Sequence, residues 1–266
     1  MRIFISSDIE GVNGMTDWNE AEKGRPEYDL FVQRQGRELA AVSEGLHLAD
    51  PQADILIKDG HGTACNVLHE LLPEYTRLFR NSGRTPYIMM HGIDMGFDAA
   101  IMAGYHSGAG FQGSPLCHTM EEDSIIYLKI NDELADEFLI NYYSALYNKV
   151  PVIMVTGDEA LCRRVTQIDP DIVTVATHTG DADGVFSRHP NVVCREMREA
   201  ACEALKRKDR CRMTLPDRFK MEIYFKQHQH AKKASWYPGV SRIANNVVVF
   251  ETQDYFELLR AYMFIS

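Results

Sequence analysis

Residues 2–11 read RIFISSDIEG, a short run rich in β-branched and aromatic residues that leads directly into two acidic residues and a glycine. This pattern predicts a first buried strand over 2–7 that ends in polar side chains. Similar strand-like runs follow at 54–58, 86–90, 99–104, 124–130, 151–156 and 171–176. Helical spacing of apolar residues predicts helices over 30–48, 132–147 and 157–165. Strands that alternate with helices predict an α/β fold with a largely parallel sheet flanked by helices.

The last part of the chain predicts a smaller lobe. Residues 191–208 have the pattern of a helix, with Asn191 as the candidate N-cap and basic residues at the end. The segment TLPDRF at 214–219 predicts a boundary. Beyond it, the pattern predicts a strand over 220–226, a turn at 237–239, a strand over 246–251 and a helix over 253–264. We therefore expect an α/β domain over 1–213 and a smaller α+β lobe over 214–266, either separate or packed as one unit.

Composition and charge exclude several classes of function. The 266 residues carry a net charge of −10, and an acidic surface repels the phosphate backbone of nucleic acids. No segment approaches the roughly 20 consecutive apolar residues of a membrane span, and the N-terminal stretch lacks the apolar run of a signal peptide. The six cysteines form no CxxC pair, so we expect free thiols in a reducing cytosol. These features predict a cytoplasmic protein without a nucleic-acid or membrane partner.

Acidic residues and histidines follow three of the predicted strands. One strand leads into Asp8 and Glu10, a second into His61 and a third into His106. Because ligands of open parallel sheets bind beyond the carboxyl ends of the strands, we expect these side chains on one face. Asp8 and Glu10 lie two residues apart on an extended chain, so both point the same way and repel each other unless a cation lies between them. Carboxylates and imidazoles suit zinc and similar metals, so the pattern predicts a metal site.

Each of these residues taken alone has a simpler interpretation. Asp8 and Glu10 fit a solvated acidic turn, and a single histidine beside a glycine fits a core or capping residue. The metal interpretation depends on their occurrence together at equivalent strand ends. The acidic run at 121–123 is interpreted as a solvated surface segment.

Several motifs together resemble the D-aminopeptidase family of zinc metallopeptidases, and the resemblance extends over essentially the whole chain. The motifs that carry it are SSDIEGVNG at 6–14, KDGHGTACN at 58–66, AGYHSGAG at 103–110, CHTM at 117–120, IND at 130–132 with DE at 136–137, PVIMVTGDEA at 151–160 and LPDRFKMEIYF at 215–225. The combination of D-x-E-G near the N-terminus with D-x-H-G and G-Y-H downstream is specific.

The resemblance implies a set of metal ligands. It implies two zinc ions per subunit, held by Asp8, Glu10, His61, His106 and one further glutamate. Asp8 is expected to bridge the two ions. For the last ligand, Glu137 fits the expected position in a helix that follows an Asn-containing turn, and Glu133 is the alternative.

The resemblance also implies an activity. His118 matches a histidine that acts directly in catalysis, as nucleophile or as general acid and base. The implied reaction is hydrolysis of the N-terminal residue of short peptides, with D-residues preferred. Family members assemble as large rings, which implies a homo-oligomer here, such as a decamer. His178 stands where the family usually has lysine, so the chain departs from the family in a detail that affects the substrate.

Two other functions remain open at this point. The same ligands serve a di-metal hydrolase that acts on another small amide. A non-catalytic, metal-containing peptide-binding protein is the second alternative, although a binding protein has no need of His118. The preference for D- over L-residues comes only from the resemblance.

Overall fold

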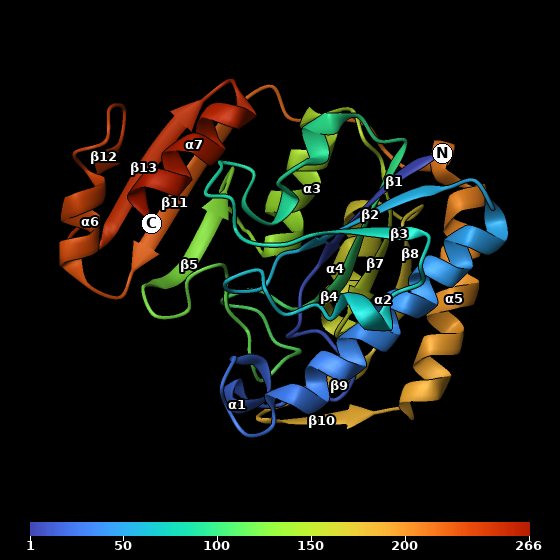
Figure 1. Cartoon of the computed structure of the whole chain (residues 1–266). Helices are drawn as coiled ribbons and strands as arrows, with labels where there is room; N and C mark the ends of the chain where they lie inside the picture. Colours follow the sequence, from blue (N-terminus) through green and yellow to red (C-terminus); the bar gives the residue numbers. More distant parts are fainter.

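A six-stranded parallel sheet forms the centre of the larger part of the molecule (Figure 1). The computed structural model describes all residues from 1 to 266. In spatial order the strands are β3 (Thr76–Phe79), β2 (Asp54–Asp59), β1 (Arg2–Ser7), β4 (Ala99–Tyr105), β7 (Val152–Gly157) and β8 (Val173–Ala176). Every neighbouring pair is parallel. The central strands are buried along almost their whole length, which explains their continuous apolar sequences.

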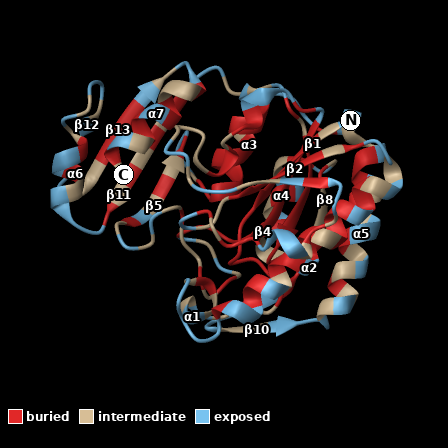
Figure 2. Cartoon of the chain, in the orientation of Figure 1, coloured by how far each residue is buried: buried red, intermediate tan, exposed pale blue.

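Helices complete this part of the fold. The long helices α2 (Tyr28–Ala49) and α5 (Pro190–Lys206) pack against each other so closely that a Cβ at Gly45 would lie 2.1 Å from a carbonyl oxygen of α5. Helix α4 (Glu159–Ile168) packs on β7 and β8, and α3 (Glu137–Tyr147) packs on β4 and β7. Figure 2 shows that the buried residues concentrate along the strands and the inner sides of these helices. The fold is thus the predicted α/β fold with a parallel sheet.

A second, five-stranded antiparallel sheet forms the smaller part. Its strands, in spatial order, are β12 (Ser241–Arg242), β13 (Val247–Thr252), β11 (Phe219–Phe225), β5 (Ile125–Ile130) and β6 (Glu133–Leu134). Buried and partly exposed residues alternate along β11, as expected where one face of a sheet packs on a core. Helices α6 (His228–Ala234) and α7 (Tyr255–Ile265) pack against this sheet. Because β5 and β6 pair with the C-terminal strands, residues 125–134 belong to the same sheet as part of 214–266. The division at 214 stays a prediction.

Three predicted elements are wrong in detail. Residues 86–90 form a 3-10 turn, η2 (Ile88–Met90), in place of a strand, and β3 takes the sheet edge instead. A short apolar run cannot be assigned by periodicity alone, and here Ile88 has a left-handed φ of 50° that no strand accommodates. The predicted helix over 132–147 begins only at Glu137. Asn131 and Asp132 both have positive φ, which makes them the tight hairpin turn between β5 and β6.

The third correction concerns the start of α5. Its N-cap is His189, which accepts a hydrogen bond from the backbone N–H of Asn191 over 3.2 Å. Pro190 occupies the first helical position, where its fixed φ and missing N–H are tolerated. Asn191 therefore lies inside the helix and is not the cap.

The remaining elements are short. They are α1 (Trp18–Ala21), the hairpin of β9 (His178–Asp181) and β10 (Gly184–Ser187), and the 3-10 turns η1 (His69–Leu71), η3 (Ile93–Met95) and η4 (Lys208–Arg210). None of the helices combines the length and the apolar character that crossing a membrane requires. All six cysteines are free thiols, as the sequence predicted.

Candidate functional site

The carboxyl ends of β2, β1 and β4 converge on one side of the parallel sheet. The strand order reverses between β1 and β4, because the chain proceeds outward from β1 to β3 and then returns to β4. Such a switch point leaves a crevice beyond the strand ends, where open parallel sheets bind their ligands. Asp8 and Glu10 follow β1, His61 follows β2 and His106 follows β4. The structure brings these four residues together, as the strand pattern predicted.

A glycine lets the loop after β1 pass close to β4. A Cβ at Gly11 would lie 1.7 Å from the carbonyl oxygen of Tyr105, so no other residue fits there without a backbone shift. The backbone N–H groups of Asp8 and Gly11 each donate to a carbonyl oxygen of β4 over 2.8 Å. These contacts fix the loop that carries Asp8 and Glu10 directly beside the end of β4.

Asp8 lies at the centre of the cluster. Its Oδ1 is 3.6 Å from Nδ1 of His61, and its Oδ2 is 3.6 Å from Nε2 of His106. Glu10 approaches His61 more closely, with 3.0 Å between Oε1 and Nδ1. Asp8 and Glu10 are each 2% exposed, so water screens their charges little. One carboxylate thus faces two histidines that come from different strands, with one oxygen toward each.

Glu137 enters the cluster from the first turn of α3. Its Oε2 is 3.6 Å from Nε2 of His106, and its Oε1 accepts a hydrogen bond from the backbone N–H of Met120 over 2.7 Å. Asp136 caps the helix by accepting from Leu139 N over 2.8 Å, which fixes where α3 begins and so where Glu137 points. The alternative residue, Glu133, is exposed in β6 and belongs to none of the groups that come together here.

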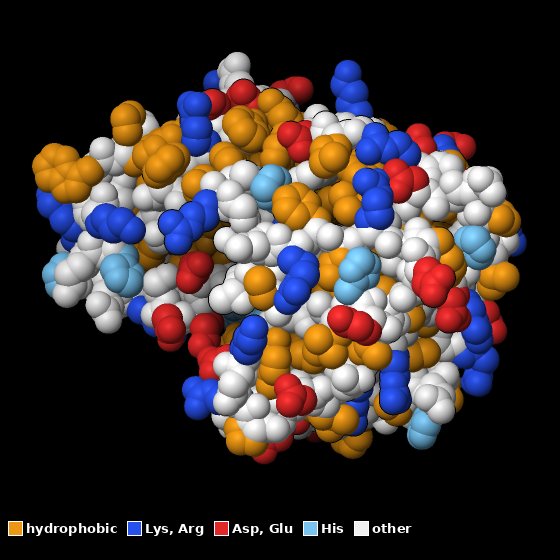
Figure 3. Space-filling view, in the orientation of Figure 1, with side chains coloured by type: hydrophobic (Ala, Val, Ile, Leu, Met, Phe, Trp, Pro, Cys, Tyr) orange, Lys and Arg blue, Asp and Glu red, His pale blue; other side chains and the backbone are white.

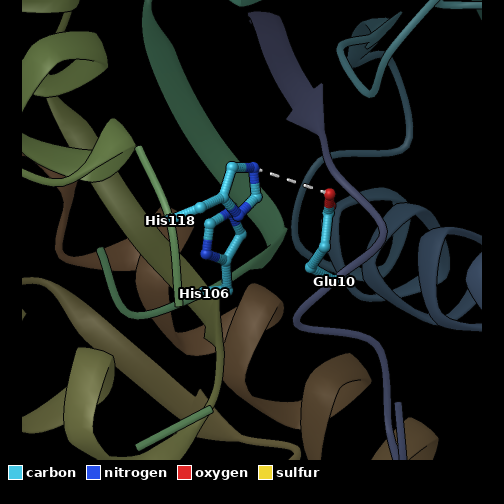
Figure 4. Close-up of side chains that lie close together, drawn as sticks. All are labelled: Glu10, His106 and His118. Carbon is cyan, nitrogen blue, oxygen red and sulfur yellow. Dashed lines mark ion pairs between the residues drawn. The ribbon is translucent and has the colours of Figure 1, made fainter. Parts of the chain in front are cut away.

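His118 lies over the same cluster. Its Nε2 is 3.5 Å from Oε1 of Glu137 and 3.9 Å from Oε1 of Glu10. The ring stacks on His106 with 4.3 Å between centroids and 7° between planes, and the edge of Trp18 packs against it. Figure 4 shows the two stacked rings and the ion pair from His118 to Glu10. The CHTM segment therefore reaches the site despite the long loop that precedes it.

The backbone sets the tautomer of all three histidines. Each ring uses one nitrogen to donate to a carbonyl oxygen, which can only accept: His61 Nε2 to Ala21 over 3.0 Å, His106 Nδ1 to Ser107 over 3.0 Å and His118 Nδ1 to Leu116 over 2.9 Å. In a neutral ring the other nitrogen then carries a lone pair, and in each case that nitrogen faces carboxylates. Such second hydrogen bonds are typical of histidines that hold a metal.

Burial and proximity shift the pKa values of these groups in opposite directions. Burial and the neighbouring carboxylates of Glu10 and Glu137 hold the pKa of Asp8 well above its usual value. Burial alone would also raise the pKa of Glu137, but His106 and then His118 lower it to about 2. Burial would lower the pKa of His61, yet Glu10 and Asp8 raise it well above its usual value. The cluster is therefore a set of strongly interacting charges away from water.

The donor atoms fit a divalent cation. Oδ2 of Asp8, Oε2 of Glu10 and Nε2 of His106 are buried and have no hydrogen-bond partner within the chain. Buried polar atoms are rarely left unpaired, and all three residues belong to groups whose potential ligand atoms lie within 4.8 Å of one another. Three overlapping groups of potential ligands occur, namely Asp8–Glu10–His61, Asp8–His106–Glu137 and Glu10–His106–His118. Nitrogen and oxygen donors in this number suit zinc.

The cluster opens into a cavity of about 530 Å³, a size typical of small-ligand sites. Several residues that sequence reasoning did not assign to the site line it, including Trp18, Arg84 and Tyr262. The acidic run at 121–123, interpreted from sequence as a solvated segment, also lines this cavity. These residues come from α1, from α7 and from loops, far apart in sequence, so no spacing pattern connects them to the strand-end motifs.

His178 lies apart from this cavity. It is 3% exposed at the start of β9, where its Nδ1 is 3.1 Å from Oγ1 of Thr177. It belongs to none of the potential ligand groups and does not line the cavity. The departure from the family at this position therefore does not change the set of residues that meet at the strand ends.

Comparisons with known proteins identify a family for the chain. The profile of the D-aminopeptidase family matches residues 1–264. A D-aminopeptidase of Bacillus subtilis (strain 168) is 27% identical over 273 residues, which cover 100% of this chain and 97% of that protein. A solved structure, described as a Zn-dependent D-aminopeptidase from Bacillus subtilis and a self-compartmentalizing protease, is 26% identical with a TM-score of 0.92 and covers 100% of this chain and 96% of that one. The resemblance seen in the motifs is confirmed, and the chain belongs to the D-aminopeptidase family.

Proposed function

We propose that the chain is a zinc-dependent aminopeptidase that removes the N-terminal residue from short peptides and prefers D-residues. The family membership, the Bacillus subtilis relative and the similar solved structure support the reaction and the metal. The observation that carries the proposal is the buried cluster, in which carboxylate oxygens and imidazole nitrogens face one another and three of these atoms have no hydrogen-bond partner. A cation removes that conflict, and a cavity beside it has room for a peptide.

We propose two zinc ions per subunit. Asp8, Glu10 and His61 would hold one ion, and Asp8, His106 and Glu137 would hold the other. Asp8 belongs to both groups because its two oxygens face different histidines. This assignment uses every predicted ligand and leaves His118 free. The third group of potential ligands, which contains His118, shares its other members with the first two.

His118 is proposed as the residue that moves a proton. Zinc, when bound, makes water acidic enough to act as a nucleophile near neutral pH and polarises a carbonyl group. The chain itself supplies the orientation: the bond from Nδ1 to Leu116 and the contact with Trp18 hold the ring of His118. Its Nε2 therefore faces the carboxylates of the cluster, from where we expect it to act as general acid or base on the scissile amide.

We further propose that the chain forms a homo-oligomeric ring, such as a decamer, and acts in the cytoplasm. The relative of known structure is described as self-compartmentalizing, which supports an assembly. A ring that encloses its active sites would restrict entry to short peptides. The free cysteines fit a reducing compartment.

The test compares D-alanine and L-alanine p-nitroanilides with metal-free protein, before and after zinc is added. We expect turnover only with zinc, and faster turnover of the D-substrate. Zinc-dependent turnover without a preference for D would retain the metallo-aminopeptidase and remove the stereochemical part. Bound zinc without turnover of either compound would refute the aminopeptidase and favour another amide substrate or a peptide-binding protein. His118→Ala serves as a variant that keeps the proposed ligands but lacks the proton-transfer group.

A further inference from the structure

The charges that line the cavity are distributed unevenly. Beyond the central cluster, four more carboxylates line it: Glu22, Glu121, Glu122 and Asp123. Only one lysine or arginine does so, and that residue is Arg84. Acidic side chains also gather beside the notch between the two lobes on the face drawn in Figure 3. An acidic lining attracts the amino end of a peptide and repels its carboxylate, so Arg84 is the one permanently cationic side chain in the cavity wall that the carboxylate can pair with.

The loop that carries Arg84 is attached to the loop that carries His61. The backbone N–H of Asn81 donates to the carbonyl oxygen of Ala64 over 2.6 Å, and Ala64 lies three residues after His61. The ammonium group of Lys58, itself buried at the end of β2, donates to the carbonyl oxygen of Asn81 over 3.0 Å. The position of the 81–84 turn is thus tied to the same strand end that positions His61.

The turn at Arg84 is tightly constrained. A Cβ at Gly83 would lie 2.1 Å from Nδ1 of His91, so only glycine fits against that imidazole. Gly83 and Arg84 both have left-handed φ values, of 63° and 47°, and such a conformation is uncommon for a residue with a side chain. The backbone therefore presents Arg84 to the cavity in a defined turn and not at the end of a loose loop.

The guanidinium group of Arg84 has no partner within the chain. It makes no hydrogen bond and no ion pair, whereas Glu22 in the cavity wall is paired with Arg25 over 2.8 Å. An arginine presents parallel N–H donors that match the two oxygens of a carboxylate. Its donors are free to bind a group that the chain does not provide.

We propose that Arg84 binds the C-terminal carboxylate of the peptide substrate and so selects short peptides with a free C-terminus. The inference rests on the proposed aminopeptidase function, because it assumes that a peptide occupies this cavity. A compact cavity of this volume is on the order of 10 Å across, the length of about three extended residues. The N-terminal residue at the metal cluster and the carboxylate at Arg84 then lie at the two ends of a dipeptide or tripeptide.

The measurement is a ratio within each protein. The kcat/KM for D-Ala-D-Ala is divided by the kcat/KM for its C-terminal amide, and the same ratio is taken for the tripeptide. Because amide and acid share every other contact, the ratio isolates the recognition of the carboxylate. The side chain of Arg84 is exposed, so water partly screens its pair with a carboxylate. We therefore expect the acid-to-amide ratio of kcat/KM to be about fivefold lower in Arg84→Ala than in the wild type, for the dipeptide, the tripeptide or both. In Arg84→Lys the ratio should fall by a smaller factor than in Arg84→Ala, because an ammonium group keeps the charge but lacks the paired donors.

Arg80→Ala is the matched control. Arg80 lies four residues earlier on the same segment, is exposed and does not line the cavity. Arg80→Ala removes the same charge near the site and should leave the acid-to-amide ratio of kcat/KM unchanged. An unchanged ratio in Arg84→Ala at both lengths would overturn the inference, and so would an equal fall in Arg80→Ala. Failure of the wild-type protein to hydrolyse any of these peptides or D-alanine p-nitroanilide would instead overturn the proposed function itself.

Discussion

Replacement of Asp136 tests how the fold positions the last residue of the cluster. Asp136 is fully buried, caps α3 through Leu139 N and forms an ion pair of 2.8 Å with Nε of Arg164. Helix α3 begins at the next residue, Glu137, so the cap also sets the start of the helix that delivers a proposed ligand. Asp136→Ala removes the cap and the ion pair together, whereas Asp136→Asn removes only the charge and keeps a side chain that caps well.

The contacts of Asp136 indicate how much free energy of unfolding each variant loses. Removal of the cap costs about 1 kcal/mol of the free energy of unfolding. Arg164 retains its bond to Leu134 O over 2.7 Å and is 19% exposed, so the broken ion pair costs less than a fully buried one, about 2 kcal/mol. We therefore expect Asp136→Ala to lose about 3 kcal/mol, or roughly 6 °C in Tm or more. Asp136→Asn keeps the cap and loses only the ion pair, so it should lose about 2 kcal/mol.

Thermal unfolding followed by circular dichroism, at one fixed zinc concentration, measures both losses. The activity of Asp136→Ala should also fall, because Glu137 loses its fixed position, while Asp136→Asn should keep most of it. Two results would refute the reasoning. One is a loss below about 1 kcal/mol in Asp136→Ala. The other is an equal effect of the two variants, since that would mean that the cap contributes nothing.

The other predictions concern the cluster and one buried carboxyl outside it. His118→Ala should lower kcat about 10²- to 10⁴-fold, while the amount of bound zinc, measured by mass spectrometry, stays unchanged. A near-normal kcat would exclude the proposed proton transfer by His118. Asp8→Asn should lose both zinc and activity, and retention of two ions would exclude its bridging position. Burial raises the pKa of Glu38 to about 8. Its protonated form therefore stabilises the fold at low pH, and that stabilisation is lost as the pH rises from about 4.5 toward 8. Glu38→Gln keeps an acceptor for the N–H of Asn13. At pH 5 it should have the same free energy of unfolding as the wild type, and at pH 9 it should be more stable than the wild type, on the order of 3 kcal/mol. Equal urea midpoints of the two proteins at pH 9 would contradict this.

The parallel sheet was predictable because its strands are buried on both faces. Strands such as 2–7 and 99–104 are therefore continuous apolar runs, and the polar residues after them mark their ends. The run at 86–90 has the same composition but is buried as a 3-10 turn, and composition alone does not separate the two. The helix at 132–147 was extended too far because the hairpin turn at Asn131 and Asp132 depends on pairing with a distant strand.

The central residues of the site were predictable for the same reason. Asp8, His61 and His106 follow strands that are neighbours in the sheet, so the sheet itself brings them together. The choice of Glu137 over Glu133 needed the structure, since it depends on where Asp136 starts the helix. Arg84 could not be found from the sequence. Its place in the cavity wall follows from a left-handed turn held by Lys58 and His91, and neither contact leaves a pattern along the chain.

A zinc titration of the metal-free protein tests the proposed zinc-dependent activity most directly. Bound zinc and hydrolysis of D-alanine p-nitroanilide are followed in the same samples as zinc is added. We expect two zinc ions bound per chain, with activity absent in the metal-free protein and complete when both are bound. Activity that is independent of zinc, or a chain that binds no zinc at this cluster, would contradict it.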